Sequence, residues 1–377
     1  MVKLKEKLKI AVAMSGGVDS SVAAKLLHDQ GHEVVGIFLR FWREEQPPLI
    51  KGGRAAPATL RLRGGRGDFD SSAEALLGAR RAAAEIGIPL RVLNFSKIFK
   101  KQVVDNFLDE YKKGRTPNPC VRCNKLVKLG FLIKQAKKLG FDFLATGHYA
   151  RLKQKNKKFS LHAAKDKNKD QSYFLYTLNQ NELKHLIFPL GGYTKTQVRG
   201  LAKKFKLPTA EKPESQEICF IPGKSHNEFL RRHLKLKPGK IKTLDGKIVG
   251  AHQGLALYTI GQRKGIKIGG TGPYYAVKMD YKTNILYVVN GGNDKILYNN
   301  KLTAKNVNWL SGVEPKLPLK CRAVIRYGHQ PEKCVIIKIN KNKYQVKFAK
   351  AQRAIAPGQS AVFYLGQEVL GGGIIEK

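Results

Sequence analysis

The sequence predicts an α/β fold class: a doubly wound parallel sheet, followed by a small central domain and a C-terminal antiparallel β-barrel. Strand-like apolar runs alternate with helix-like segments over the first half of the chain, as in a parallel sheet with crossover helices. Short alternating runs separated by Gly, Asn and Lys turns dominate from about Tyr281, which is typical of a small barrel. Gly- and Pro-rich sequence with short mixed elements lies between them. We expect domains at 1–205, 206–280 and 281–377.

Apolar runs and helical segments in alternation define the predicted parallel sheet. The expected strands span residues 8–14, 32–42, 90–95 and 141–150. The expected helices span residues 20–30 and 125–139, stopped by Gly31 and Gly140, and another helix ends within residues 80–89. Ligands bind at the carboxyl ends of strands in such sheets. The glycine turn after the first strand and the Gly147–His148 loop after the fourth are therefore candidate site segments.

The stretch from residue 46 to residue 78 is predicted to be irregular, and residues 46–67 within it have no clear periodicity. Residues 46–67 are rich in Gly, Ala and Arg, whereas the flanking sequence uses Lys. We expect a poorly ordered loop or insertion here, and a local sequence or reading-frame artefact is the alternative.

The 377-residue chain carries 70 Lys and Arg against 28 Asp and Glu, a net charge of +42. Such a positive field favours a polyanionic partner, nucleic acid above all. A membrane surface is less favoured, because no basic amphipathic segment has a clear apolar face. A lysine-rich solvated surface is the alternative. We find no apolar run of about 18 residues and no signal peptide, and five cysteines do not make a disulfide scaffold. We expect a cytoplasmic protein with no membrane partner.

The segment AMSGGVDSSVAAKLL, which begins at Ala13, places two glycines and three hydroxyl groups between a strand and a helix. Backbone N–H groups at a helix N-terminus bind phosphate oxygens, and Gly16 and Gly17 allow close approach. Asp19 fits such a site if it holds Mg²⁺ or fixes the loop. Because Gly-Lys-Ser/Thr is missing, this is not the usual P-loop of γ-phosphate hydrolases. An ordinary glycine turn with a serine N-cap is the alternative.

The segment TPNPCVRCNK carries Cys120 and Cys123 in a Cys-x-x-Cys pair. Two prolines predict a rigid turn, and Asn118 can cap a helix or contact a base edge. Cys123 precedes the helix expected from residue 125 and has an arginine and a lysine as neighbours, so both the helix terminus and the cations favour a thiolate. Metal binding, a redox pair and two structural thiols are the alternatives.

The other three cysteines lie in apolar sequence. Cys219, in ESQEICFIPGKSH, is by itself expected to be a buried apolar residue. Cys321 and Cys334 lie in alternating strand-like runs and are expected to be buried in the barrel.

Ordered motifs along nearly the whole chain resemble the tRNA-specific 2-thiouridylase family. SGGVDSS resembles the pyrophosphatase-type loop of enzymes that split ATP into AMP and pyrophosphate while adenylating a substrate. The other motifs that resemble the family, in its order, are TPNP with CNK, ATGHYAR, KDQSYFLY, SQEICFIP, YTIGQRKGI and QRAIAPGQSAVFY with LGGGII. The resemblance fails only around residues 46–78. It implies a sheet like that of the adenine nucleotide alpha hydrolases and a tRNA-uridine 2-sulfurtransferase activity.

The resemblance implies that ATP adenylates the C2 oxygen of the wobble uridine in tRNAs of the Lys, Glu and Gln type, and that sulfur then displaces this oxygen. It implies Cys219 as the persulfide carrier and Cys123 as the second catalytic cysteine, which helps to release sulfide or closes a disulfide. A sulfur-donor protein, either a cysteine desulfurase or a relay, is the implied partner. The implied ATP-binding residues are Ala13, Met14, Ser15, Gly16, Gly17, Val18, Asp19, Ser20, Leu39 and Gly147, with Mg²⁺ as the expected ion. The implied tRNA-binding residues are Asn118, Pro119, Cys120, His148, Lys169, Asp170, Gln171, Arg326, Tyr327 and Gln359.

One position departs from the family pattern. Cys120 stands where the commonest form of the motif has an aspartate that is assigned to acid–base work. Either the proton transfer comes from elsewhere or Cys120 has another task. A minority hypothesis is an iron–sulfur cluster on Cys120, Cys123 and Cys219.

Two further functions compete with thiolation. One is another enzyme with the same ATP loop, such as an amidating ligase or a lysidine-forming tRNA enzyme. The other is a non-catalytic, basic RNA-binding protein.

Overall fold

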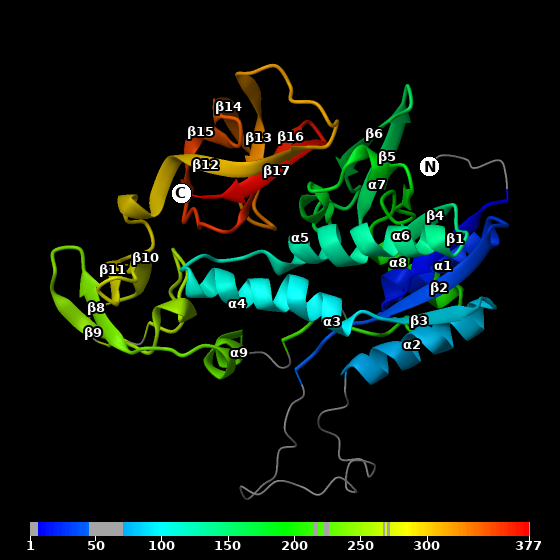
Figure 1. Ribbon diagram of the computed structural model, residues 1–377, viewed down its shortest axis with the longest axis horizontal. Coiled ribbons are helices and arrows are strands. Elements are labelled where there is room, and N and C mark those ends of the chain that lie inside the picture. The colour runs from blue at the N-terminus through cyan, green and yellow to red at the C-terminus, as the bar shows by residue number, and fades with distance from the viewer. Residues whose placement is uncertain are drawn as a thin grey trace, which may run out of the picture. The chain divides into compact units, whose positions relative to one another are not determined.

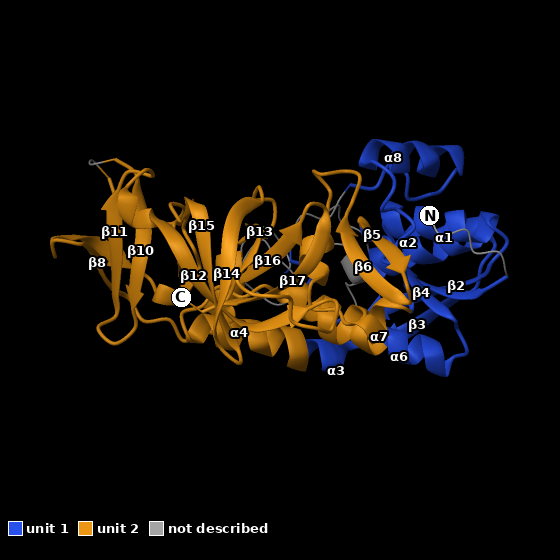
Figure 2. Ribbon diagram, turned by 90° about the horizontal axis from the view of Figure 1, so that it is seen from above, with its two compact units in different colours: residues 1–100, 132–148, 185–225 blue, residues 101–131, 149–184, 226–377 orange. Residues whose placement is uncertain are grey.

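The computed structural model describes residues 7–44, 71–213, 218–221, 226–266, 268–269 and 272–376. The chain forms two compact units, drawn in blue and orange in Figure 2. Unit 1 holds residues 1–100, 132–148 and 185–225, and unit 2 holds residues 101–131, 149–184 and 226–377. The chain therefore passes between the units several times. The domain limits expected at residues 205 and 280 stay a prediction.

Unit 1 is built on a five-stranded sheet in the order β3-β2-β1-β4-β7, in which every pair is parallel. The strands are β1 Lys9–Ala13, β2 Glu33–Arg40, β3 Leu90–Asn94, β4 Phe143–Thr146 and β7 Leu186–Ile187. Ile10, Ala11 and Val12 are 0% exposed, as expected for a central strand that is covered on both faces. The four predicted strands and the parallel sheet are confirmed.

Helices cover both faces of this sheet. Figure 2 shows α1, α2 and α8 on one side and α3 and α6 on the other. Their bounds are α1 Val18–Asp29, α2 Ser71–Ile86, α3 Ser96–Phe99, α6 Gly130–Lys138 and α8 Lys195–Lys204. Gly31 and Gly140 follow α1 and α6 with φ angles of +87° and +79°, so the predicted glycine stops are confirmed. The doubly wound arrangement is confirmed as well.

The loop predicted for residues 46–78 is wrong at its C-terminal end. Residues 71–78 form the first half of α2, because Ala, Leu, Glu and Arg favour a helix and Leu76 and Ala79 bury an apolar stripe. Residues 46–70 lie outside the described residues.

Unit 2 contains a closed antiparallel barrel, coloured from orange to red in Figure 1. The strand order is β12-β15-β14-β13-β16-β17, and pairing of β12 with β17 closes the barrel. The strands are β12 Tyr298–Trp309, β13 Leu319–Val324, β14 Glu332–Asn340, β15 Lys343–Arg353, β16 Ser360–Leu365 and β17 Glu368–Ile375. The predicted C-terminal barrel is confirmed.

A hairpin from the middle of the sequence extends the barrel sheet. Strands β5 Ala150–Lys155 and β6 Lys158–Ala163 pair with each other, and β6 pairs with β17 at Val369 and Glu368. No strand was expected beyond residue 150 in this part of the sequence, so this hairpin is a new finding. Its partner strand lies about 200 residues further along the chain, which no local pattern reveals.

The remaining elements of unit 2 are a small sheet and short helices. The sheet has the order β10-β11-β8-β9, from β8 Gly239–Thr243, β9 Ile248–His252, β10 Tyr274–Asp280 and β11 Ile285–Asn290. The helices are α4 Asp105–Lys112, α5 Pro119–Cys123, α7 Gln180–Leu183 and α9 His226–His233. No helix in the described part of the chain has the length and apolar character that a membrane crossing needs.

The barrel core buries two cysteines side by side. Cys321 on β13 lies opposite Cys334 on β14, and their Sγ atoms are 3.6 Å apart. They are 8% and 5% exposed and pack with Ile336, Val346 and Phe363. The predicted burial of both cysteines is confirmed.

We predict that Ile336→Ala lowers the free energy of unfolding by about 2–5 kcal/mol, because it empties space in a packed core. Ile336 is 0% exposed, whereas Ile339 on the same strand is 52% exposed. Ile339→Ala is the matched control and should stay within about 0.5 kcal/mol of the parent. Urea unfolding followed by circular dichroism measures both. Equal losses in the two variants would contradict the assigned barrel interior.

Candidate functional site

The loop after β1 lies at the switch point of the parallel sheet. Ala13, the last residue of β1, is paired with Ile37 of β2 and with Thr146 of β4. Strands β2 and β3 continue the sheet on one side of β1, and β4 and β7 continue it on the other. Ligands of open α/β sheets bind in the crevice that such a reversal creates. Residues 13–20 and Gly147 therefore meet at one edge of the sheet, as predicted.

Three glycines allow the neighbouring backbones to approach this loop. Gly16 has a φ of +73°, and a Cβ atom on it would lie 1.9 Å from the carbonyl oxygen of Ala75 in α2. A Cβ atom on Gly78 would lie 2.9 Å from the Gly16 oxygen, and one on Gly147 would lie 2.8 Å from the Ser20 nitrogen. The loop is thus enclosed by α2 on one side and by the end of β4 on the other.

The start of α1 lacks a capping side chain. Its N-cap is Gly17, which makes no side-chain cap hydrogen bond. The hydroxyl groups of Ser20 and Ser21 both donate to the Gly17 carbonyl, at 3.3 and 2.9 Å. The alternative of a serine N-cap is therefore wrong. First-turn N–H groups without a capping side chain are the usual anion-binding groups of such loops.

Asp19 in the first turn of α1 is held by a lysine from α8. The Lys195 Nζ donates to both carboxylate oxygens, at 2.7 and 2.8 Å, and the Lys195 side chain is only 11% exposed. Of the two predicted roles of Asp19, this geometry supports the loop anchor, because the ion pair with Lys195 ties the first turn of α1 to α8. In the described ranges, no three His, Cys, Asp or Glu residues form a group that could hold a metal ion.

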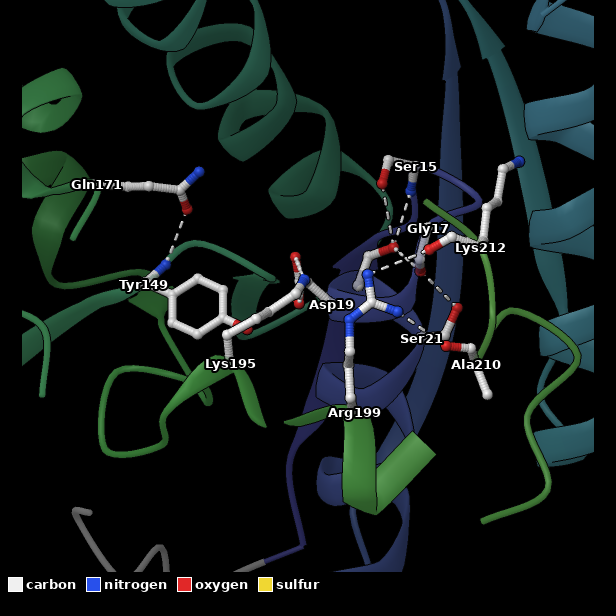
Figure 3. A network of polar contacts seen from close by, with 11 residues as sticks. Ser15, Gly17, Asp19, Ser21, Tyr149, Gln171, Lys195, Arg199, Ala210 and Lys212 are labelled. Carbon is white, nitrogen blue, oxygen red and sulfur yellow. Dashed lines mark hydrogen bonds and ion pairs between the residues drawn. The ribbon is translucent and has the colours of Figure 1, made fainter. Parts of the chain in front are cut away.

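Two more cations flank the loop. Arg199, one turn after Lys195, donates to the carbonyl oxygens of Ala210 and Lys212 at 3.2 and 3.5 Å. Figure 3 shows its side chain reaching from α8 toward Gly17. The Lys212 ammonium lies 3.7 Å from a Glu74 carboxylate oxygen. None of these cations was among the residues predicted from the sequence.

A sequence signal for α8 was present. Thr194 and Gln197 form a capping box, in which each side chain bonds the backbone N–H of the other residue. The spacing Thr-x-x-Gln before an apolar position is a standard helix start. This helix-start signal predicts that Lys195 and Arg199 lie on one helix, one turn apart.

The other residues implied at the nucleotide site lie nearby in unit 1. Leu39 is 9% exposed near the end of β2. The Nδ1 atom of His148, which was assigned to tRNA, shares a hydrogen bond of 2.8 Å with the Thr146 hydroxyl, and its ring packs edge-on against Phe188. His148 therefore stabilises the end of β4.

The helix that carries Cys120 and Cys123 starts earlier than predicted. Asn118 is the N-cap of α5 and accepts a hydrogen bond from the Val121 nitrogen at 3.2 Å. Pro119 occupies the first helical turn, where proline is favoured. Cys123, the last residue of α5, is followed directly by a π-helical turn, Asn124–Lys128, so it lies within helical backbone and not ahead of a helix, and Cys120 is the cysteine near the helix start. We call residues 118–123 the cysteine turn.

The two cysteines of this turn differ in exposure. Cys120 is exposed, whereas Cys123 is buried. The neighbouring Arg122 donates to the backbone oxygen of Gln102, and Lys125 pairs with Glu182 at 3.0 Å. Both cations therefore have other partners, and Glu182 offsets the positive charge of Lys125.

Cys219 is exposed in unit 1, so the expectation of a buried cysteine is wrong. Phe220 and Ile221 beside it are 2% and 7% exposed, and Phe220 packs edge-on against Phe99 at 5.7 Å. The apolar neighbours anchor the segment and leave the sulfur at the surface. Residues 214–217 and 222–225 lie outside the described residues.

Two of the three residues in the implied tRNA motif at 169–171 stabilise their own loop. Asp170 accepts hydrogen bonds from the Ala164 and Ser172 nitrogens and from the Ser172 hydroxyl, at 2.9, 3.2 and 2.7 Å. Burial raises the pKa of its carboxyl group. The Gln171 Oε1 accepts from the Tyr149 nitrogen at 3.0 Å. Lys169 is half-buried beside them.

Arg326 and Tyr327 sit at the end of β13 in unit 2. Tyr327 is 42% exposed, and its ring centroid lies 4.4 Å from that of Phe174. Burial lowers the pKa of the Arg326 guanidinium. An exposed aromatic beside an arginine suits base stacking. Gln359, also in unit 2, instead donates its Nε2 to the carbonyl oxygens of Thr116 and Pro117, at 3.0 and 3.2 Å.

We predict that Gly147→Ala lowers the free energy of unfolding by about 1–3 kcal/mol, because the new Cβ would force the first turn of α1 to move. Gly200→Ala is the matched control. Gly200 lies inside α8 with nothing within 4 Å of an added Cβ, so alanine should stabilise by about 0.4–1 kcal/mol. Urea unfolding of both variants measures the difference. A neutral Gly147→Ala would contradict the close approach at this loop.

Comparison with known proteins places this architecture in a family. Residues 8–223 match a family described as tRNA methyl transferase HUP domain, residues 227–290 its PRC-barrel domain, and residues 299–375 an aminomethyltransferase beta-barrel domain. A protein of Coxiella burnetii (strain RSA 493) named tRNA-specific 2-thiouridylase MnmA is 43% identical over 100% of both chains. A protein of the same name from Carboxydothermus hydrogenoformans is 45% identical over 98% of both chains. The chain therefore belongs to the tRNA-specific 2-thiouridylase family.

Proposed function

We propose that this protein is a tRNA-uridine 2-sulfurtransferase, which uses ATP to place sulfur on carbon 2 of the wobble uridine. The observation that carries the proposal is a built anion-binding loop, at the sheet's switch point, in a chain whose full-length relatives are named 2-thiouridylases. The exposed Cys219 supplies a thiol for sulfur chemistry. We place the reaction in the cytosol.

The loop of residues 13–20 binds the phosphates of ATP in this proposal. ATP supplies the adenylyl group that turns the C2 oxygen of uridine into a leaving group. The first-turn N–H groups of α1 hold the phosphate oxygens. Among the residues that the structure describes here, the cations Lys195, Arg199 and Lys212 face the carboxylates of Asp19 and Glu74. Positive charge beside the loop favours the polyphosphate.

Mg²⁺ would accompany ATP and offset the charge of its phosphates. Both Asp19 oxygens already accept hydrogen bonds from Lys195. Asp19 and Lys195 together fix the first turn of α1, so that its N–H groups keep their direction. The loop is therefore organised before the nucleotide arrives.

Cys219 carries the sulfur as a persulfide, which a donor protein, a cysteine desulfurase or a relay, loads onto it. The terminal sulfur bonds to C2 of the adenylated uridine, and AMP leaves with the former C2 oxygen. The thiolate of Cys123 attacks the Sγ of Cys219, so the persulfide S–S bond breaks and a Cys123–Cys219 disulfide forms. A cellular dithiol then reduces this disulfide for the next cycle.

The tRNA is bound through charge and stacking. The net charge of +42 gives salt-dependent affinity for the RNA backbone. Tyr327 and Phe174 offer rings on which an unpaired base can stack, beside Arg326. The wobble base must leave the anticodon stack to reach the reactive groups. We expect tRNAs of the Lys, Glu and Gln type.

We predict that Cys219→Ser abolishes thiolation but keeps tRNA binding and tRNA-dependent pyrophosphate release, because adenylation precedes sulfur transfer. Thiolated nucleoside is measured by mass spectrometry, pyrophosphate by a coupled assay and binding by filter retention. Cys321→Ala, at a thiol inside the barrel, is the control and keeps thiolation. Normal thiolation by Cys219→Ser would refute the assigned carrier. If the parent enzyme released no pyrophosphate in the presence of tRNA, the proposed adenylation step would be refuted.

The iron–sulfur alternative on Cys120, Cys123 and Cys219 makes a different prediction. It requires iron and visible absorbance in anaerobically purified protein. We propose the persulfide route without a cluster, so a colourless, iron-free and active preparation is the expected result.

A further inference from the structure

The segment just before the cysteine turn is held by residues from distant parts of unit 2. We call residues 115–117 the anchor segment. The Thr116 nitrogen donates to the Pro357 carbonyl oxygen at 2.8 Å. The Gln359 Nε2 donates to the carbonyl oxygens of Thr116 and Pro117, at 3.0 and 3.2 Å. The turn before β16 therefore binds the anchor segment through three hydrogen bonds.

This turn approaches the anchor segment closely because it contains a glycine. Gly358 has a φ of +93°, and a Cβ atom on it would lie 2.9 Å from the Thr116 oxygen. The Gly358 nitrogen donates to the Ile375 oxygen at 2.8 Å, and the Ile375 nitrogen donates to the Gln359 oxygen at 2.8 Å. Because these two bonds to Ile375 of β17 hold the turn in place, the side-chain amide of Gln359 projects from a fixed backbone.

The sequence YTIGQRKGI provides a second contact. The hydroxyl groups of Thr259 and Thr116 lie 3.0 Å apart and share a hydrogen bond. On the other side of the anchor segment, Arg115 makes two bonds of 2.5 Å to the carboxylate of Glu110 in α4. That pairing holds the pKa of Glu110 below its ordinary value. The anchor segment is thus fixed by side chains from three separate regions of the chain.

The position of the anchor segment is transmitted to the cysteine turn. Pro117 and Pro119 restrict the backbone on either side of Asn118, and both prolines are buried. Asn118 caps α5, on which Cys120 and Cys123 lie. A shift at Thr116 therefore moves both sulfur atoms, because little backbone freedom lies between them.

We propose that Gln359 and Thr259 are positioning residues: they hold the anchor segment and, through it, set the placement and reactivity of the cysteine turn. This role rests on the proposed sulfur chemistry of Cys123. It differs from the tRNA contact that the family resemblance implies for Gln359, because both of the Gln359 bonds described above point into the protein. In this proposal the barrel positions the thiols of the cysteine turn and also contributes to RNA binding.

The test compares Gln359→Met with Gln352→Met. Methionine removes the amide and keeps the approximate side-chain volume. Gln352 is the matched control, since its amide donates to the Lys350 oxygen two residues away on the same strand, β15. Thr259→Val removes the second contact, and Thr259→Ser retains the hydroxyl. Thermal unfolding establishes that each variant is folded.

The first readout needs neither tRNA nor activity. Iodoacetamide alkylation of Cys120 and Cys123 is followed against pH by peptide mass spectrometry, after tryptic cleavage at Arg122 separates the two cysteines. We expect Gln359→Met and Thr259→Val to change the rate or the pH profile of alkylation, whereas Gln352→Met and Thr259→Ser keep those of the parent. Unchanged alkylation in Gln359→Met and Thr259→Val would overturn the proposal.

The second readout is single-turnover thiolation together with tRNA affinity. A displaced thiol should lower the rate about tenfold to a hundredfold, with the tRNA Kd unchanged. A rise in Kd that accounts for the whole loss would overturn the proposal in favour of a tRNA contact. If the parent enzyme formed no thiouridine, the proposed function would fail, and the alkylation experiment would still decide whether these residues position the cysteine turn.

Discussion

Close backbone approach around the loop after β1 is the constraint on which unit 1 depends. A Cβ atom on Gly16 or Gly147 would fall within 3 Å of the neighbouring backbone, so neither α2 nor the end of β4 could keep its place against a larger residue. Because these contacts define the loop's walls, the N–H groups of α1 face the edge of the sheet in a fixed direction. The Asp19–Lys195 pair then ties the same turn to α8. The geometry of this loop therefore depends on backbone packing as well as on charge.

In unit 2, tertiary contacts hold the cysteine turn, on which the proposed sulfur chemistry depends. The five-residue helix α5 continues into a π-helical turn, Asn124–Lys128, and helical segments this short have little stability in water without tertiary contacts. The cysteine turn is instead supported by neighbours: the anchor segment before it, Gln102 beneath Arg122, and Glu182 beside Lys125. Most of these supports come from elements far away in the sequence. The cysteine turn therefore depends on contacts with the barrel, such as the bonds from Gln359 to the anchor segment.

Several residues that the family resemblance assigns to tRNA have a structural task in this chain. Asp170 and Gln171 satisfy backbone N–H groups of their own loop, and Gln359 satisfies two carbonyl oxygens. Buried backbone groups need such partners, since leaving one unpaired costs about 1–3 kcal/mol. An RNA-binding surface needs a stable fold beneath it. The hydrogen bonds of Asp170, Gln171 and Gln359 stabilise the fold from which more exposed groups, such as Tyr327, would contact a nucleotide in the proposed function.

The sequence by itself determined the alternation of strands and helices, the glycine turn after β1, the barrel and the burial of Cys321 and Cys334, because these follow from local periodicity and turn residues. Local signals also mark the start of α5, where Asn118 caps the helix ahead of Pro119, and the start of α8, where Thr194 and Gln197 form a capping box. Only the tertiary structure decided which segments meet. Lys195 reaches Asp19 across 176 residues, and Gln359 reaches Thr116 across 243. Such pairs depend on how sheets and barrels close in space, and one-dimensional patterns do not carry that information. The same reason explains why Cys219, which lies in apolar sequence, is nevertheless exposed.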